Sequence, residues 1–200
     1  MPRLTSYAQN GEDVRIWHAF GPLPHDESPT NLTYVDIGAS APRDLSITAA
    51  LYDLGWRGIL IEADPDLARE LQVHRPEDTV VQAAAASQAG TVPFYRVPGT
   101  GLGTLDRAEA DAALERGFEV SETTVDCQRL DDILDEHLQG ADDQLRAIHA
   151  MTIDVEGAEA LVLKGLSLTR YRPWVLCIES VEPGTTNPSH QSWEPSLLAR

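Results

Sequence analysis

Cysteine is scarce in this chain: the two cysteines, Cys127 and Cys177, each lie in an apolar, strand-like run. This favours reduced core thiols over a disulfide framework. Basic residues are also few, 15 against 32 Asp and Glu, and Lys164 is the one lysine. The net charge of −17 argues against a surface for DNA, RNA or anionic lipid.

No apolar run is long enough for a membrane span, and residues 1–20 lack the basic start and apolar core of a secretory signal. We therefore expect a soluble, cytoplasmic protein with no nucleic-acid partner, exported only if a signal has been removed.

The length of 200 residues suits one domain with a sizeable core and is too short for two full ones. Apolar residues make up 42 % of the chain and charged residues 24 %, which is a globular rather than a disordered composition. There is no internal repeat and no low-complexity tract. A single domain over residues 1–200 is therefore predicted.

Short apolar runs alternate with amphipathic stretches along the chain. Strands are predicted at residues 34–38, 58–61, 79–85, 148–155 and 174–178, with a hairpin strand at 91–97 and another strand at 118–127. Helices are predicted around 47–54, 65–71, 105–117, 130–137 and 158–163, and surface loops at 21–30 and 99–103. The pair Asp64-Pro65 combines an N-cap acceptor with a proline at the first helical position. This alternation is typical of βαβ units, so the predicted fold class is α/β, with a doubly wound, mostly parallel sheet.

Acidic residues lie at or next to the carboxyl ends of four predicted strands: Asp36, Glu62, Asp154 and Glu179. In a doubly wound sheet, ligands bind outside those ends, near the point where the strand order reverses. Any one of these acids could be solvated at the rim of the sheet. An acid in or just after an apolar run is costly unless it is paired or binds something, so four together indicate a ligand site.

Glu62 ends the second predicted strand, 24 residues after Gly38, where nucleoside sites keep a carboxylate for ribose hydroxyls. A nicotinamide site would need G-x-G-x-x-G after the first strand, but the chain has Gly38-Ala-Ser-Ala-Pro-Arg43. A nucleoside cofactor without phosphates, such as S-adenosylmethionine, fits this turn better. A nucleotide-binding oxidoreductase on a similar sheet stays open as the alternative, disfavoured by the missing glycines.

Several motifs together resemble the FkbM-type methyltransferases. The motifs are Ser6-Tyr-Ala-Gln-Asn-Gly-Glu-Asp13, Tyr34-Val-Asp-Ile-Gly-Ala39 followed by Pro42, Gly55-Trp-Arg-Gly58, Ile61-Glu-Ala-Asp-Pro65, Ile153-Asp-Val-Glu-Gly-Ala-Glu159, Arg172-Pro-Trp174, Ile178-Glu179 and Trp193-Glu-Pro195. The resemblance covers nearly the whole chain and implies a Rossmann-like class I fold. It also implies an S-adenosylmethionine-dependent O-methyltransferase acting on a hydroxyl group, often of a sugar in a glycan or of a natural product.

The resemblance assigns cofactor roles to named positions. It implies that Asp36, Gly38 and Ala39 contact the methionine end, that Glu62 holds the ribose with Ala63 beside it, and that Gln82 and Ala83 flank the adenine. It also implies a domain layout of a cap segment at 1–30, a cofactor-binding sheet at 31–180 and a C-terminal loop at 181–200. In the cap segment, Gln9 is expected near the cofactor together with Ser6, Glu12 and Asp13. These cap residues are equally well explained as a helix N-terminus, where acids favour the dipole.

A sugar hydroxyl is a poor nucleophile at neutral pH, so a general base or a metal ion must help to remove its proton. We predict Asp154 as base or metal ligand, with Glu156 in support and Glu159 as a first-turn acid of the next helix. If the strand continues past Asp154, then Asp154 and Glu156 share a face; if a turn begins there, only one enters the pocket. Asp154 and Glu179 could also hold a divalent ion such as magnesium through oxygen ligands.

The chain departs from the class I pattern at its C-terminal end. Such sheets usually finish with two more strands, and nothing after Ser180 has the pattern of a strand. The last two strands are therefore expected to be absent, and the chain to be either truncated or naturally short. Residues 174–178 would then form an exposed apolar edge, which predicts poor solubility or self-association into a homo-oligomer. A degenerate, non-catalytic binding module stays open as a further alternative.

Overall fold

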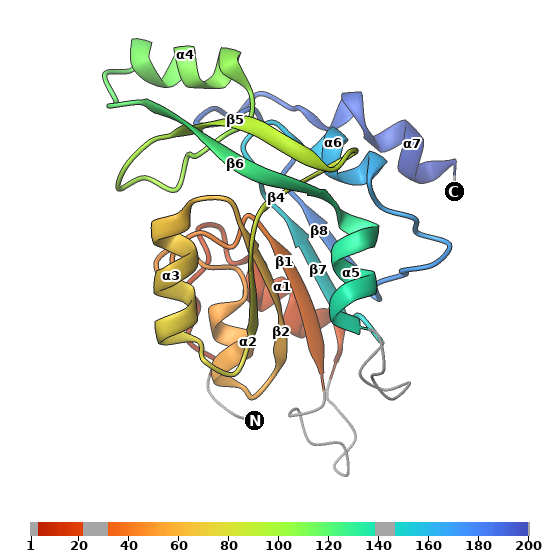
Figure 1. The fold of residues 1–200 in the computed structure, drawn as a ribbon. Coiled ribbons are helices and arrows are strands. Elements are labelled where there is room, and N and C mark those ends of the chain that lie inside the picture. The colour runs from red at the N-terminus through yellow and green to blue at the C-terminus, as the bar shows by residue number, and fades with distance from the viewer. Residues whose placement is uncertain (1–3, 22–31, 139–146, 200) are drawn as a thin grey trace.

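A five-stranded parallel sheet forms the centre of the computed structural model, which describes residues 4–21, 32–138 and 147–199 (Figure 1). The strand order is β3-β2-β1-β7-β8, and every neighbouring pair runs parallel. The strands are β1 (Thr33–Ile37), β2 (Arg57–Glu62), β3 (Thr79–Gln82), β7 (Ala150–Ile153) and β8 (Val175–Ile178). The predicted α/β class with a mostly parallel sheet is confirmed.

The strand order reverses at β1, which pairs with β2 on one side and with β7 on the other. Tyr34 is the register partner of both Gly58 in β2 and Ala150 in β7. A Cβ atom at Gly58 would lie 2.2 Å from the Tyr34 carbonyl oxygen, so this close approach requires glycine. The carboxyl ends of β1 and β7 therefore lie side by side at the switch point, where doubly wound sheets bind their ligands.

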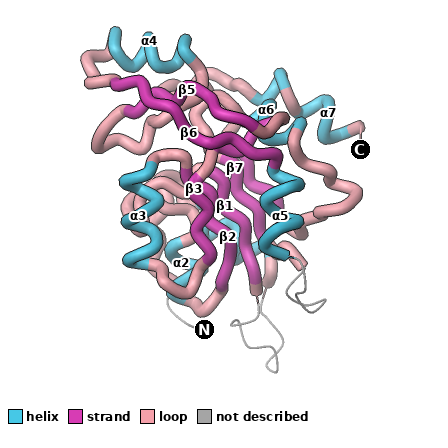
Figure 2. Tube along the Cα trace, in the orientation of Figure 1, coloured by secondary structure: helices cyan, strands magenta, loops and turns pink. Residues whose placement is uncertain are grey.

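Helices cover both faces of the sheet (Figure 2). One face packs under α1 (Glu12–Ala19), α2 (Ala49–Asp53) and α3 (Pro65–His74) through a core that includes Ile16, Leu51, Leu71 and Leu60. The other face packs under α5 (Leu130–Leu138) and α6 (Glu159–Lys164) through a core of leucine, isoleucine and valine side chains. At the start of α3, Asp64 accepts a hydrogen bond from the Asp66 amide, with Pro65 in the first turn, as the sequence predicts.

The predicted strand at 79–85 is wrong in its extent, because it breaks at Ala83 into β3 and β4 (Ala84–Ala86). The Ala83 amide donates to the Glu62 carbonyl, as the last bond of the ladder with β2, and also to the Val81 carbonyl. From Ala84 onward the chain pairs with β6 (Ser121–Arg129) in a different sheet. The alanines after the break are buried: Ala85 packs into the core under α5 and α6, and Ala84 and Ala86 pack into the core of the second sheet.

This second sheet has the order β4-β6-β5, with β5 (Gly90–Arg96) antiparallel to β6. It lies across the carboxyl end of the central sheet, with α4 (Arg107–Glu115) on its far side (Figure 1). The predicted strands at 91–97 and 118–127 are thus present, and they form a roof over the ends of β1 and β2.

The segment after β8 is more ordered than the predicted loop at 181–200. It contains an isolated bridge between Val181 and Pro188, a 3₁₀ turn η2 (His190–Ser192) and the short helix α7 (Glu194–Leu198). Burial of Trp193 in the core anchors these turns. As predicted, no strand follows β8 within the described residues, so β8 is an edge strand there.

None of the helices in the described ranges combines the length and the hydropathy that a membrane span needs. The loop predicted at 21–30 lies outside the described residues, apart from Gly21.

Candidate active site

A cavity of about 490 Å³ opens between the carboxyl ends of β1 and β2 and the second sheet. Five of the residues singled out in the sequence line it: Gly38, Glu62, Ala63, Ala83 and Asp154. The roof comes from the segment between β5 and α4, including Val97, Pro98, Gly99, Thr100, Gly101, Gly103 and Leu105. The loop at 99–103, predicted from its glycines, thus covers the cavity.

Gly38 makes the turn that leaves β1. Its φ is 81°, and a Cβ atom there would lie 1.8 Å from the Asp154 carbonyl oxygen. The amides of Gly38 and Ala39 both donate to the Ile61 carbonyl, so the turn is fixed against β2. No other residue fits this position without moving the backbone.

Glu62 is buried at the end of β2 and holds the two loops beside it. Its Oε2 accepts a hydrogen bond from the Ser40 amide at 2.8 Å, and its Oε1 accepts one from the Asp64 amide at 2.7 Å. Burial raises the pKa of Glu62 to about 7, although both amide hydrogen bonds lower it. The carboxylate retains lone pairs for further donors, because two oxygens offer about four acceptor positions.

The lining of the cavity is strongly acidic, with six carboxylate residues against one cation: Asp44, Glu62, Asp64, Asp66, Glu70 and Asp154 against Arg96. Arg96 extends from β5 to the start of α3. Its Nε and Nη2 donate to Asp64 at 2.6 and 2.8 Å, and Nη2 also donates to Asp66 at 2.6 Å. The Arg96 charge is therefore paired with Asp64 and Asp66, and among the described residues the lining offers an anionic ligand no unpaired cation.

Asp36 does not line this cavity. Its carboxylate is buried in β1 and accepts hydrogen bonds from the hydroxyls of Thr152 at 2.6 Å and Thr48 at 2.5 Å. The buried guanidinium of Arg75 donates to the same Thr48 hydroxyl at 3.0 Å. Asp36 therefore joins β1 to β7 and to the start of α2, outside the lining of the cavity.

Three other residues from the predicted cofactor set also lie outside the lining: Gln9 and Gln82 are exposed, and Ala39 is buried. In the N-terminal segment, Asp13 is buried and accepts hydrogen bonds from the Ser6 hydroxyl and the Tyr7 amide. The segment still reaches the site, because Ala8 forms a bridge with Leu45, a cavity-lining residue.

Next to the cavity, Asp154, Glu156 and Glu179 form a cluster in which one oxygen from each lies within 4.8 Å of the others. The carboxyl groups of Asp154 and Glu179 lie close together in this cluster, so a proton on one of them would allow a hydrogen bond between the two. Burial raises the pKa of both carboxyl groups. The charge of Asp154 raises the pKa of Glu179 further, whereas the interaction with Glu179 lowers that of Asp154. Burial, followed by the charges of Asp154 and Glu159, raises the pKa of Glu156 to about 8.

Two oxygens of this cluster, Glu156 Oε2 and Glu179 Oε2, are buried and have no hydrogen-bond partner. Buried carboxylate oxygens of this kind suit a proton, a donor hydroxyl or a hard divalent cation. Glu159 is in the first turn of α6, as expected, and accepts hydrogen bonds from the amides of Val155 and Gly157. It thereby closes the turn that carries the cluster.

Comparison with known proteins identifies a family that this chain matches. The family model for the methyltransferase FkbM domain matches residues 36–199. No curated protein matches the chain. Among solved structures, methyltransferase FkbM from Methylobacillus flagellatus KT is similar, with 21 % identity and a TM-score of 0.46 over 82 % of this chain. The chain spans 37 % of the length of that protein.

Proposed function

Because the chain belongs to the FkbM methyltransferase family, we propose that it transfers a methyl group from S-adenosylmethionine to a sugar hydroxyl of a small-molecule or glycan acceptor. One observation carries the choice of cofactor. The cavity at the switch point has a buried carboxylate, Glu62, and a lining whose single cation is already paired. A nucleoside with a positive charge and no phosphate fits this lining, whereas a dinucleotide would meet acids where it needs donors.

The residues that line the cavity fit the proposed cofactor. Glu62 would accept hydrogen bonds from the ribose hydroxyls, Gly38 would admit the methionine end close to the backbone, and Ala63 and Ala83 would flank the nucleoside. Asp36 and Ala39 would act indirectly, through the turn after β1. For Gln9 and Gln82 we retain, as a prediction, the contacts that the family resemblance implies: Gln9 near the cofactor and Gln82 beside the adenine. When bound, the cofactor supplies an electrophilic methyl group on a sulfonium ion.

The acceptor hydroxyl has to lose a proton as the new carbon–oxygen bond forms. Of the three clustered acids, Asp154 lines the cavity, so we assign the proton transfer to Asp154. Glu156 and Glu179 lie within 4.8 Å of it and would share the proton afterwards. Most of the rate acceleration would come from holding acceptor and methyl group in line, which makes the displacement effectively unimolecular.

The same cluster also fits a divalent metal ion, because two of its buried oxygens lack partners. Asp154, Glu156 and Glu179 would hold magnesium through oxygen ligands, and the ion would lower the pKa of an acceptor hydroxyl. Removing metal with a chelator decides this part of the proposal. Unchanged turnover would leave proton transfer to Asp154 alone. We also propose a cytoplasmic location, where both cysteines would stay as the free thiols that the structure has.

Calorimetry with S-adenosylhomocysteine and with NAD tests the cofactor assignment. We expect the first to bind and the second not to bind. Glu62→Gln should weaken S-adenosylhomocysteine at least tenfold, because a buried hydrogen bond to a charged acceptor is lost. Glu70→Gln is the matched control, since Glu70 lines the same cavity but is exposed. Binding of NAD alone would favour the oxidoreductase alternative, and binding of neither would favour a non-catalytic module.

A further inference from the structure

Three residues other than glycine have a left-handed backbone in the described part of the chain: Ser40 with φ 53°, Leu45 with φ 57° and Glu156 with φ 52°. Ser40 and Leu45 line the cavity, and Glu156 belongs to the carboxylate cluster. Residues with side chains rarely adopt this conformation unless their surroundings hold them in it, and such residues gather at functional sites. Each of the three therefore raises the question of what holds it.

Each left-handed residue is held by a different part of the chain. Ser40 donates its amide to Glu62, and Leu45 is bridged to Ala8. Glu156 is held from the roof of the cavity, where the Thr104 hydroxyl donates to the Glu156 carbonyl at 2.7 Å. The two residues are 52 positions apart in the sequence.

Thr104 is well placed to hold another segment. It is 2 % exposed, and its backbone pairs with Tyr95 in both directions, at 3.0 and 2.9 Å. Its hydroxyl also accepts the Asp106 amide at 3.0 Å, just before α4. The hydroxyl position is therefore fixed by β5 on one side and by the start of α4 on the other.

The conformation of Glu156 decides where its carboxylate lies. Strand β7 ends at Ile153, so the alternation of a strand does not bring Asp154 and Glu156 to one face. The left-handed pair Glu156 and Gly157, with φ of 52° and 99°, turns the chain back. The Glu156 carboxylate consequently lies within 4.8 Å of those of Asp154 and Glu179. The Glu159 carboxylate fixes this turn by accepting hydrogen bonds from the Val155 and Gly157 amides. The Thr104 hydroxyl fixes it by donating to the Glu156 carbonyl.

We propose that Thr104 is a positioning residue, whose hydroxyl holds Glu156 in the left-handed turn that brings its carboxylate to Asp154 and Glu179. That this cluster acts on the acceptor rests on the proposed function. Thr104 lies among the residues that roof the cofactor cavity, between Gly103 and Leu105. The roof over the cofactor thus also sets the geometry of the acids proposed to deprotonate the acceptor.

The test compares Thr104→Val, which keeps the shape and removes the hydroxyl, with Thr104→Ser, which restores it. Thr100→Val is the matched control, because the Thr100 hydroxyl bonds within the same roof, to the Val97 carbonyl, and not to Glu156. NMR couplings that depend on φ report the conformation of Glu156 without any ligand. We expect Thr104→Val to lose the left-handed signature and to raise amide exchange at residues 155–157 at least tenfold. Thr104→Ser and Thr100→Val should keep both as in the wild type.

A left-handed Glu156 with exchange within twofold of the wild type in Thr104→Val would overturn the proposal. If that variant fails to fold, NMR of the wild type still tests the proposal. A buried, hydrogen-bonded Thr104 hydroxyl proton should exchange slowly with solvent and show an NMR contact to the Gly157 amide. A rapidly exchanging hydroxyl without that contact would also overturn the proposal.

Failure of the proposed function can be distinguished from failure of the Thr104 proposal. If S-adenosylhomocysteine fails to bind the wild type, the cofactor assignment is wrong, while the ligand-free NMR still judges Thr104. Once an acceptor is identified, Thr104→Val should lower kcat about tenfold with the KM for S-adenosylmethionine unchanged, and Thr104→Ser should recover kcat. A changed KM with kcat intact would contradict positioning of the acid.

Discussion

At the scale of single residues, Gly38 shows how a backbone position can set the geometry of a site. Gly38→Ala would bring a Cβ atom to 1.8 Å from the Asp154 carbonyl, in addition to the positive φ of 81°. Gly117→Ala is a matched control, because Gly117 has φ 89° but nothing within 4 Å of the added atom. We expect Gly117→Ala to cost about 1 kcal/mol of unfolding free energy, from the backbone alone. Gly38→Ala should cost roughly 3 kcal/mol or more, because overpacking adds to it. Equal costs in urea unfolding would show that the turn after β1 can move away.

A variant at Asp154 can separate acid–base chemistry from cofactor binding. Asp154 lines the cavity and also belongs to the carboxylate cluster, so its loss could affect either one. Asp154→Asn keeps the shape of the side chain and removes the base. Turnover should fall by about 10²-fold or more, the range of general base catalysis, with S-adenosylhomocysteine affinity within about threefold of the wild type. Asp44→Asn, at an exposed position of the same lining, should change neither quantity. Loss of affinity together with turnover would reassign Asp154 to the cofactor.

Sequence reasoning located Gly38, Glu62 and Asp154 because the ends of parallel strands meet at one edge, and strand ends are visible as the ends of apolar runs. It did not find the partners of Asp36, since nothing in the sequence joins Asp36 to Thr48 and Thr152 before the strands are paired. Thr104 could not be found either. Its role depends on a contact between two sheets, and no local pattern records it.

At the scale of elements, the second sheet was predicted as strands but not as a separate sheet. The choice of partner for residues 84–86 is long-range, since they pair with residues 127–129 rather than with β2. This pairing places the second sheet over the cavity, where it forms the roof. Arg96 ties that roof to the start of α3 through Asp64 and Asp66, and this connection can be cut selectively.

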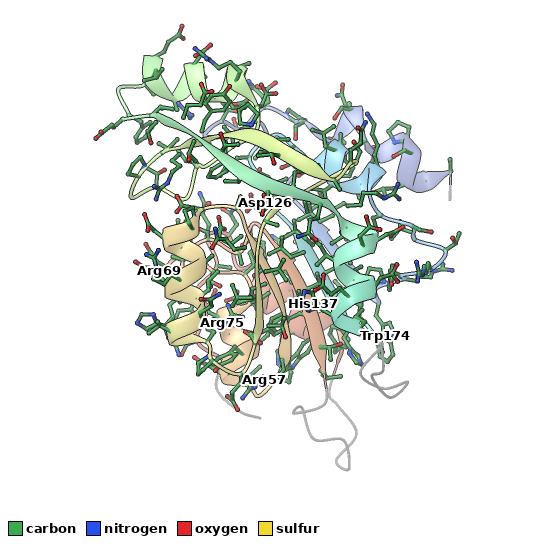
Figure 3. All side chains as sticks on the ribbon, in the orientation of Figure 1. Arg57, Arg69, Arg75, Asp126, His137 and Trp174 are labelled. Atoms are coloured by element: carbon green, nitrogen blue, oxygen red, sulfur yellow. The ribbon has the colours of Figure 1, made fainter. Side chains whose placement is uncertain are left out.

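Arg96→Gln should loosen the roof and weaken S-adenosylhomocysteine about tenfold, the order expected for a partly buried, bidentate ion pair. Arg69→Gln removes another cation from the same Asp66 carboxylate. Arg69 lies on α3 and points outward from it (Figure 3), and it does not line the cavity. Calorimetry on both variants distinguishes the roof from the general charge of α3. Equal losses for both variants would mean that the Asp66 charge, and not the connection between sheets, supports binding.

At the scale of the whole molecule, the buried acids make stability depend on pH. The folded-state pKa of Glu62 is raised to about 7 and that of Glu156 to about 8. A raised carboxyl pKa means that the folded state binds the proton more tightly, so the stabilisation is complete below the ordinary pKa and is lost as pH rises through about 7 and 8. The melting temperature should therefore fall between pH 5 and pH 9, by about 5 °C or more if the loss is about 2 kcal/mol.

The contribution of one buried carboxyl group to this slope is tested by removing that group. Glu62→Gln should flatten the lower part of the melting curve against pH. Glu70→Gln, which removes an exposed acid, should leave the slope unchanged. A wild-type melting temperature that rises with pH would show that these carboxyl groups are ionised and stabilised in the folded protein.

The net charge of −17 also opposes the association expected at the edge of the sheet. In the described part of the chain no strand pairs with the outer edge of β8, and Trp174 just before it is 68 % exposed. Figure 3 shows Trp174 at the end of the sheet opposite the second sheet, away from the cavity. Unpaired edge groups beside an exposed aromatic ring favour pairing with another chain, whereas like charges on two copies repel each other until salt screens them.

Self-association should therefore increase with salt, because the screening length falls from about 10 Å at 0.1 M to about 3 Å at 1 M. Sedimentation of the wild type should show mostly monomer at low salt and a growing dimer or larger fraction at high salt. Trp174→Glu should stay monomeric in both conditions. Leu198→Glu adds the same charge at another exposed apolar residue and should behave like the wild type. A wild type that is monomeric at every salt concentration would mean that the β8 edge is protected by its own charges and needs no partner.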